Sequence, residues 1–198
     1  MNITPLFSKP LYSNSLNENV ISLIDITGPL KSENNKLSTS EQKDFYILEK
    51  EENYFLKGLI ENEIKQFLNE ELKYTNDFKI TTSWFTEIDD KQESHNHQHN
   101  NCFMSGVLYL KTEKNCGNIV FEDMSNRRFC LDVGDFNPIN SRTWSVEPYD
   151  GLIVMFPSEV WHKVELNKSG TVRNSLAFNV IPTGLIGNKQ SDSQAYYE

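Results

Sequence analysis

Two hydrophobic periods divide the chain. Across 51–73, apolar side chains recur at steps of three and four residues, which predicts a long helix with one buried stripe, formed by Leu56, Leu59, Ile60, Ile64, Phe67, Leu68 and Leu72. After Asn76-Asp77 the period shortens to two, and β-branched and aromatic residues dominate 79–88. The pattern therefore predicts a helical part at about 13–75 and a β core at about 78–181.

The first residues contain shorter signals. Residues 1–12 place apolar side chains between two prolines and predict an opening strand. Ser15-Leu-Asn-Glu18 has the pattern of a capping box, so a short helix is expected to begin there, with its apolar face made by Leu16, Val20 and Leu23. Residues 27–42 are polar and predict a loop. We expect both helices to pack against one outer face of the β structure.

The β core divides into short strands separated by turn signals. They are expected near 78–88, 97–111, 117–122, 128–133, 143–147, 152–157, 161–166 and 172–181. Many short strands at close spacing are typical of a sandwich, barrel or jelly roll. We therefore expect a single, mainly β domain over 1–186, followed by a polar, frayed tail over 187–198.

Composition narrows the class of protein. The chain has 198 residues and a formal net charge of −9, which disfavours a sequence-independent grip on nucleic acid. No run approaches the eighteen or so apolar residues of a membrane span, and the first residues lack the pattern of a signal peptide. Cys102, Cys116 and Cys130 form no CxxC pair, which is typical of reduced thiols. We expect a cytoplasmic protein.

Histidines carry the strongest chemical signal. Three of the four lie within 95–99, and the fourth is His162. On a strand, the two-residue spacing of His97 and His99 directs both side chains to one face. Two imidazoles on one face, with His162 from a distant strand, predict a metal site that keeps open positions, as catalytic metal sites do.

Other arrangements of the same stretch remain open. His95-Asn-His97 is a competing pair with the same spacing, although we favour His97 with His99 and place His95 at the rim. His99-Asn-Asn-Cys102 could clip a zinc ion, but no second half with matching spacing exists. A preceding acidic loop could supply a carboxylate from Asp89, Asp90 or Glu93. The histidines could also form a surface loop with incidental metal affinity.

A candidate anion site follows in the sequence. Arg173 and Ser175 share one face of the last predicted strand, and Tyr109 could contribute its phenol from another. A guanidinium fork with hydroxyl groups suits a carboxylate, although Arg173 alone could equally be a surface ion-pair partner. The tryptophans, Trp84, Trp144 and Trp161, could line a pocket, but aromatic residues in strands more often belong to the core.

Several segments together resemble the 2-oxoglutarate/Fe(II)-dependent oxygenase superfamily, and more narrowly its branch in bacteria and marine phages. They are Pro5-Leu-Phe-Ser-Lys-Pro10, His97-Gln-His99, Ser105-Gly-Val-Leu-Tyr-Leu110, Gly117-Asn-Ile-Val-Phe121, Gly151-Leu-Ile-Val-Met-Phe-Pro-Ser158, His162 and Arg173-Asn-Ser-Leu-Ala-Phe-Asn179. Each motif is short, so their order and spacing carry the resemblance. At His99, most of the superfamily has a carboxylate.

The resemblance implies a double-stranded β-helix, the cupin-like jelly roll, with Fe(II) between its two sheets. It implies that the metal ligands are His97, His99 and His162, and that 2-oxoglutarate is bound by Arg173, Ser175, Tyr109 and Asn179. It also implies that O2 is consumed, that succinate and CO2 are released, and that an unidentified substrate is hydroxylated. A phage origin would place the protein in the host cytoplasm.

Two other functions compete with this one. A cupin-like dioxygenase with three histidines would need no keto acid, and a non-catalytic β-sandwich would only bind a metal or a small acid. The substrate is expected to be a small molecule or a protein side chain. The sequence leaves the oligomeric state open.

Overall fold

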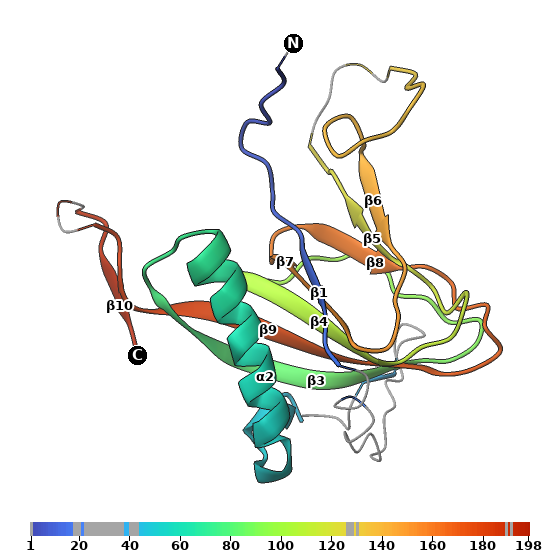
Figure 1. The fold of residues 1–198 in the computed structure, drawn as a ribbon, viewed down its shortest axis with the longest axis horizontal. Coiled ribbons are helices and arrows are strands. Elements are labelled where there is room, and N and C mark those ends of the chain that lie inside the picture. The colour runs from blue at the N-terminus through green and yellow to red at the C-terminus, as the bar shows by residue number, and fades with distance from the viewer. Residues whose placement is uncertain are drawn as a thin grey trace.

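The computed structural model describes residues 2–17, 21, 38–39, 44–125, 129, 131–188, 190 and 192–198. Its strands form two antiparallel sheets (Figure 1). The large sheet has the order β1-β7-β4-β9-β3-β2, with β10 added to β9: β1 Tyr12–Ser15, β7 Leu152–Pro157, β4 Met104–Lys111, β9 Arg173–Ile186, β3 Asp77–Ile88, β2 Ser38–Thr39 and β10 Ala195–Tyr197. The small sheet has the order β6-β5-β8: β6 Thr143–Val146, β5 Ile119–Glu122 and β8 Trp161–Val164.

The long helix is confirmed where its apolar stripe predicts it. A 3-10 turn, η2 (Glu51–Asn53), leads into α2 (Tyr54–Lys65), which continues as the π-helical turn η3 (Gln66–Glu71). Another 3-10 turn, η1 (Ile47–Glu49), precedes them. Within the described part of the chain, no helix is long and apolar enough to cross a membrane.

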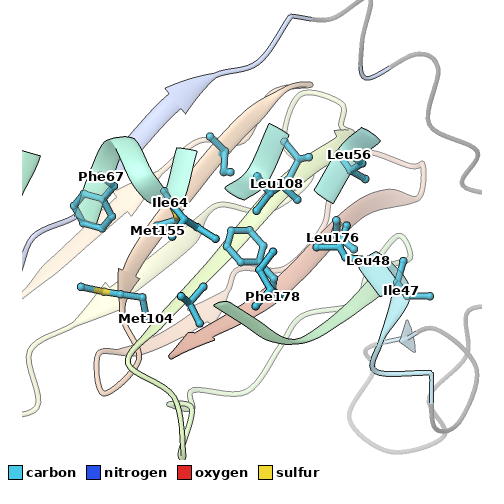
Figure 2. Close-up of a cluster of buried hydrophobic side chains, with 14 of the residues drawn as sticks. Ile47, Leu48, Leu56, Ile64, Phe67, Met104, Leu108, Met155, Leu176 and Phe178 are labelled. Carbon is cyan, nitrogen blue, oxygen red and sulfur yellow. The ribbon is translucent and has the colours of Figure 1, made fainter. Parts of the chain in front are cut away.

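The helix lies across one face of the large sheet (Figure 1). Figure 2 shows the core between them, where helix side chains such as Ile64 and Phe67 face Leu108, Met155 and Phe178 of the sheet. Because strand side chains alternate, the neighbours of these residues on β9 point the other way, toward the small sheet. That second face of β9 holds Arg173, Ser175 and Asn179, so the amphipathic helix determines which face of the sheet is free for a site.

Most predicted strands are confirmed with shifts at their ends, and five expectations need correction. The strand expected over 97–111 begins at Met104, because Asn101 has φ 60° and left-handed backbone interrupts extended pairing. The strand expected over 128–133 is absent from its described residues. Phe129 and Leu131 there are 78% and 81% exposed, so no partner strand buries them.

The ends of the chain differ from expectation as well. The opening strand lies at Tyr12–Ser15 rather than over 1–12, because this segment pairs with β7. Ser15 is therefore strand rather than a helix cap, and the rest of the expected first helix falls outside the described residues apart from a helical Ile21. The tail expected to fray contains β10, which pairs with Gly184–Ile186 of β9.

Two glycines provide a matched test of the packing. A Cβ on Gly106 of β4 would lie 2.2 Å from the ring of Phe178, which is fully buried, whereas one on Gly58 of α2 would meet nothing within 4 Å. Gly106→Ala should therefore lower the free energy of unfolding by about 1–3 kcal/mol through overpacking. Gly58→Ala should raise it by up to about 1 kcal/mol through helix propensity. Urea unfolding measures both, and a Gly106→Ala protein as stable as the wild type would contradict this packing.

Candidate metal centre

Three histidines from two distant segments meet at one end of the small sheet. His162 lies on β8 opposite Phe121 of β5, and its backbone forms an isolated antiparallel bridge with His97. Both hydrogen bonds of that bridge measure 2.9 Å, from each N–H to the other residue's carbonyl. One ring nitrogen each of His97, His99 and His162 lies within 4.8 Å of the others. The structure thus brings together the three residues expected to bind the metal.

Backbone carbonyls determine which ring nitrogen is available on two of these histidines. The Nδ1 of His97 lies 2.9 Å from the carbonyl oxygen of His95, and the Nδ1 of His162 lies 2.9 Å from that of Val160. A carbonyl oxygen only accepts, so each Nδ1 carries the proton and donates it. The lone pair of each Nε2 is therefore free to bind a metal. A hydrogen bond from the other ring nitrogen is the usual support of a metal-binding imidazole.

Burial keeps the three imidazoles neutral. It lowers the pKa of His97 below its ordinary value, lowers that of His99 to about 4 and lowers that of His162 to about 3, and neighbouring imidazoles push the last two in the same direction. Neutral imidazole is the form that binds a metal. The site therefore offers three ligands at neutral pH without first releasing protons.

The alternative ligands lie outside the group. Among the described residues, the only group of side chains placed closely enough to hold one metal ion is that of the three histidines. His95 is exposed beside His97, Asp90 faces Lys91 and the backbone N–H of Gly170, and neither joins the cluster. The same holds for Asp89, Glu93 and Cys102. Three protein ligands leave coordination positions open, which suits a catalytic ion better than a closed structural one.

Aromatic side chains enclose the histidines. Phe156 packs edge-on against His162 with ring centroids 4.7 Å apart, and Trp84 lies 5.9 Å from His99. The expectation that the tryptophans belong to the core is wrong for all three: Trp84 is half-buried beside a histidine, Trp144 is exposed, and Trp161 is half-buried on the small sheet. Strand periodicity alone cannot distinguish an aromatic core residue from one at the wall of a site.

A buried cation and a buried phenol lie deeper between the sheets. Arg173 and Tyr109 are nearly inaccessible to solvent, and the guanidinium carbon of Arg173 lies 4.7 Å from the centre of the Tyr109 ring. Arg173 Nη1 donates to the carbonyl of Gly117 at 2.8 Å. Gly117 has φ +91°, and a Cβ there would lie 2.3 Å from the carbonyl oxygen of Glu165, so glycine is required for this approach.

Two polar atoms of this pair lack partners. The hydroxyl of Tyr109 and the Nε of Arg173 are buried and make no hydrogen bond with any residue that the structure describes. Such groups are costly unless something binds them. Burial also raises the pKa of Tyr109, so the phenol keeps its proton and can donate it. The donor set therefore fits the carboxylate of a bound acid such as 2-oxoglutarate.

One apolar cluster connects the arginine–tyrosine pair with the histidines. Tyr109, Phe121 and Phe156 belong to one apolar cluster between the sheets, and the last two also contact His162. Ser175 is buried on β9 directly opposite Tyr109, and the contact of Ser175 with the co-substrate stays a prediction. Asn179 is already bonded to Ser105 and Thr82, and its contact with the co-substrate stays a prediction.

Two supporting residues were not foreseen from the sequence. The carbonyl of Gly117 holds Arg173, and the carbonyl of Ser158 accepts the backbone N–H of His99 at 3.0 Å. Backbone acceptors leave no side-chain signature. The sequence signals that could have pointed to them were the position of Gly117 just before a buried strand and the Pro157-Ser158 bend just after another.

Protonation of the histidines should destabilise the metal-free protein. In the unfolded chain an imidazole binds a proton near pH 6.5, whereas folded His99 and His162 resist protonation down to about 4 and about 3. Between these values the unfolded state holds more protons, so the free energy of unfolding falls as pH falls. His162→Gln should make that slope shallower by up to about 1.4 kcal/mol per pH unit. Denaturant unfolding between pH 6.5 and 4 measures it, with His95→Gln as the exposed control; equal slopes in His162→Gln and the wild type would contradict a buried neutral His162.

Comparison with known proteins agrees with this geometry. A family model described as "Putative 2OG-Fe(II) oxygenase" matches residues 82–179, a span that contains every predicted site residue. No curated protein sequence matches the chain.

Solved structures share the fold. A prolyl-4-hydroxylase from Pseudomonas putida is similar with a TM-score of 0.59 at 16% identity, over 88% of this chain and 93% of that one. A viral collagen prolyl hydroxylase from Paramecium Bursaria Chlorella virus-1, solved with 2OG, gives 0.54 at 12% identity over 86% and 94%. An oxidoreductase of the 2OG-Fe(II) oxygenase family from Burkholderia pseudomallei gives 0.59 at 11% identity over 82% and 76%. The predicted double-stranded β-helix is confirmed by this likeness, and residues 82–179 carry the match to the 2OG-Fe(II) oxygenase family model.

Proposed function

We propose that this protein is an Fe(II)- and 2-oxoglutarate-dependent dioxygenase that hydroxylates a C–H bond of an organic substrate and releases succinate and CO2. One observation carries the proposal. Three neutral imidazoles lie beside the apolar cluster that contains Tyr109, and the buried pair of Tyr109 and Arg173 has two donors, the phenol and Nε, without a partner among the described residues. The first group suits a metal with open positions and the second suits a carboxylate.

The histidines would hold the metal with their Nε2 atoms. Bound Fe(II) supplies the redox chemistry by which O2 oxidises 2-oxoglutarate to succinate and CO2 and places one oxygen atom on the substrate. The bonds from Nδ1 to the carbonyls of His95 and Val160 keep two of the rings in the tautomer that this requires. Phe156 and Trp84 limit water beside the ligands.

Arg173 and Tyr109 would anchor the co-substrate through its far carboxylate. Both are buried, so their charge and hydrogen bonds act where water does not compete. Three neutral ligands leave the full charge of a divalent ion uncompensated, and an anionic co-substrate would supply the missing negative charge. Ser175, opposite Tyr109, is the proposed third contact.

The cysteines support a cytoplasmic location for the proposed activity. Cys102 and Cys116 are free thiols, which suits the reducing cytoplasm, where Fe(II) is also preserved. We therefore place the proposed activity there.

Tyr109→Phe should separate co-substrate binding from stability. Removal of an unsatisfied buried hydroxyl should raise the free energy of unfolding of the metal-free protein by about 1 kcal/mol. The same change should weaken 2-oxoglutarate binding about tenfold, which corresponds to about 1.4 kcal/mol for one lost hydrogen bond. The visible charge-transfer band of the anaerobic Fe(II)–2-oxoglutarate complex, titrated with the acid, gives the affinity.

Tyr12→Phe is the matched control. Tyr12 donates to Glu63 at 2.7 Å on the helix side of the large sheet, so its loss should reduce stability and leave the affinity unchanged. Unchanged 2-oxoglutarate affinity in Tyr109→Phe would argue against the phenol as a ligand of the acid.

Succinate formation distinguishes the competing functions. The wild type with Fe(II), O2 and 2-oxoglutarate should release succinate above background, and His162→Ala should abolish that release because it removes a ligand. Oxygen uptake without 2-oxoglutarate, undiminished in Arg173→Ala, would instead identify a three-histidine dioxygenase that needs no keto acid. An iron-loaded protein with neither succinate nor oxygen uptake would favour a non-catalytic binding protein.

A further inference from the structure

His99 is supported differently from the other two histidines. It lies in a short loop, residues 98–103, between the His97 bridge and the start of β4. Among the described residues, no group hydrogen-bonds to either of its ring nitrogens, whereas His97 and His162 each have a carbonyl at Nδ1. Something other than a ring hydrogen bond must therefore fix its position.

Ser158 closes that loop from the opposite side. Its carbonyl accepts the N–H of His99 at 3.0 Å, and its own N–H donates to the carbonyl of Phe103 at 3.1 Å. Phe103 in turn donates to Val180 of β9 at 2.8 Å. Asn101 is in the left-handed region at the turn, and both ends of the loop are held by the backbone of one residue, through the carbonyl and the N–H of Ser158.

The side chain of Ser158 begins a buried chain of hydrogen bonds. Its hydroxyl lies 2.8 Å from that of Ser105 on β4, Ser105 donates to Oδ1 of Asn179 on β9 at 2.8 Å, and Nδ2 of Asn179 donates to Thr82 on β3 at 2.9 Å. An amide oxygen only accepts, so the proton of Ser105 is committed and Ser158 must donate to Ser105. We call these four residues, Ser158, Ser105, Asn179 and Thr82, the hydroxyl–amide chain.

We propose that the hydroxyl–amide chain positions His99 as the third metal ligand, with Ser158 as its central residue. The chain joins three strands of the large sheet, β4, β9 and β3, to Ser158, whose backbone N–H and carbonyl hold the His99 loop. Metal–ligand distances tolerate only about 0.2 Å, so a loop held less firmly binds metal less well even though Ser158 touches no metal. The proposal depends on the proposed function only in that the three histidines bind a divalent ion.

Metal affinity tests the role without any turnover. Metal-free protein is titrated with Co(II), whose visible absorption reports both affinity and coordination. Ser158→Ala should weaken Co(II) binding about tenfold or more, which is the usual effect of removing a residue that supports a metal ligand. It should also shift the absorption spectrum toward that of His99→Ala. Ser105→Ala should do the same, and it serves if Ser158→Ala fails to fold. The double variant should cost little more than either single one, because both break the same chain.

Ser83→Ala is the matched control. Ser83 and Ser158 are both 1% exposed, and the hydroxyl of Ser83 accepts the N–H of Leu48 at 2.9 Å on the helix side of the large sheet. Its loss should reduce stability but change Co(II) affinity less than twofold. Ser158→Ala and Ser105→Ala affinities within twofold of the wild type, or equal weakening in Ser83→Ala, would overturn the positioning role alone. A wild-type protein that binds no Co(II) would overturn the metal site and this proposal together.

Discussion

The backbone bridge between His97 and His162 is the contact on which the site depends. Two backbone hydrogen bonds join a strand of the small sheet to a segment that would otherwise be an exposed loop. The bridge places both rings on the inner side of the small sheet, and the carbonyls of residues two positions earlier then fix each ring. Without the bridge, the histidine-rich segment would be no more than a surface loop with incidental metal affinity.

The large sheet supplies Arg173 and Tyr109 because the side chains of its strands alternate between its two faces. On β9, side chains that face the helix form the core, and those between them face the small sheet. Arg173 reaches the buried phenol of Tyr109 from that second face, where water is excluded. The amphipathic helix α2 thus has an indirect part in the chemistry, because it occupies the face of the sheet that the site does not use (Figure 1).

The sequence predicted which residues form the site better than it predicted the backbone conformation of those residues. His97 and His99 were grouped because a strand would point both to one face, yet His99 lies in a loop before the strand begins. The grouping still holds, because the turn at Asn101 and the peptide of Ser158 bring its ring back to the others. A left-handed residue and a backbone acceptor are tertiary facts, and neither has a periodic signal in the sequence. The same limit explains β10, whose strand forms only because β9 offers an edge.

The three histidines proposed as metal ligands are neutral, whereas the oxygenase superfamily that the sequence resembles usually has a carboxylate in the place of His99. A crystal structure of the anaerobic complex with Fe(II) and 2-oxoglutarate tests it most directly. We predict iron bonded to Nε2 of His97, His99 and His162, with the far carboxylate of 2-oxoglutarate on Arg173 and Tyr109. A loop carboxylate or His95 in the place of His99, or 2-oxoglutarate bound away from Arg173, would contradict this account.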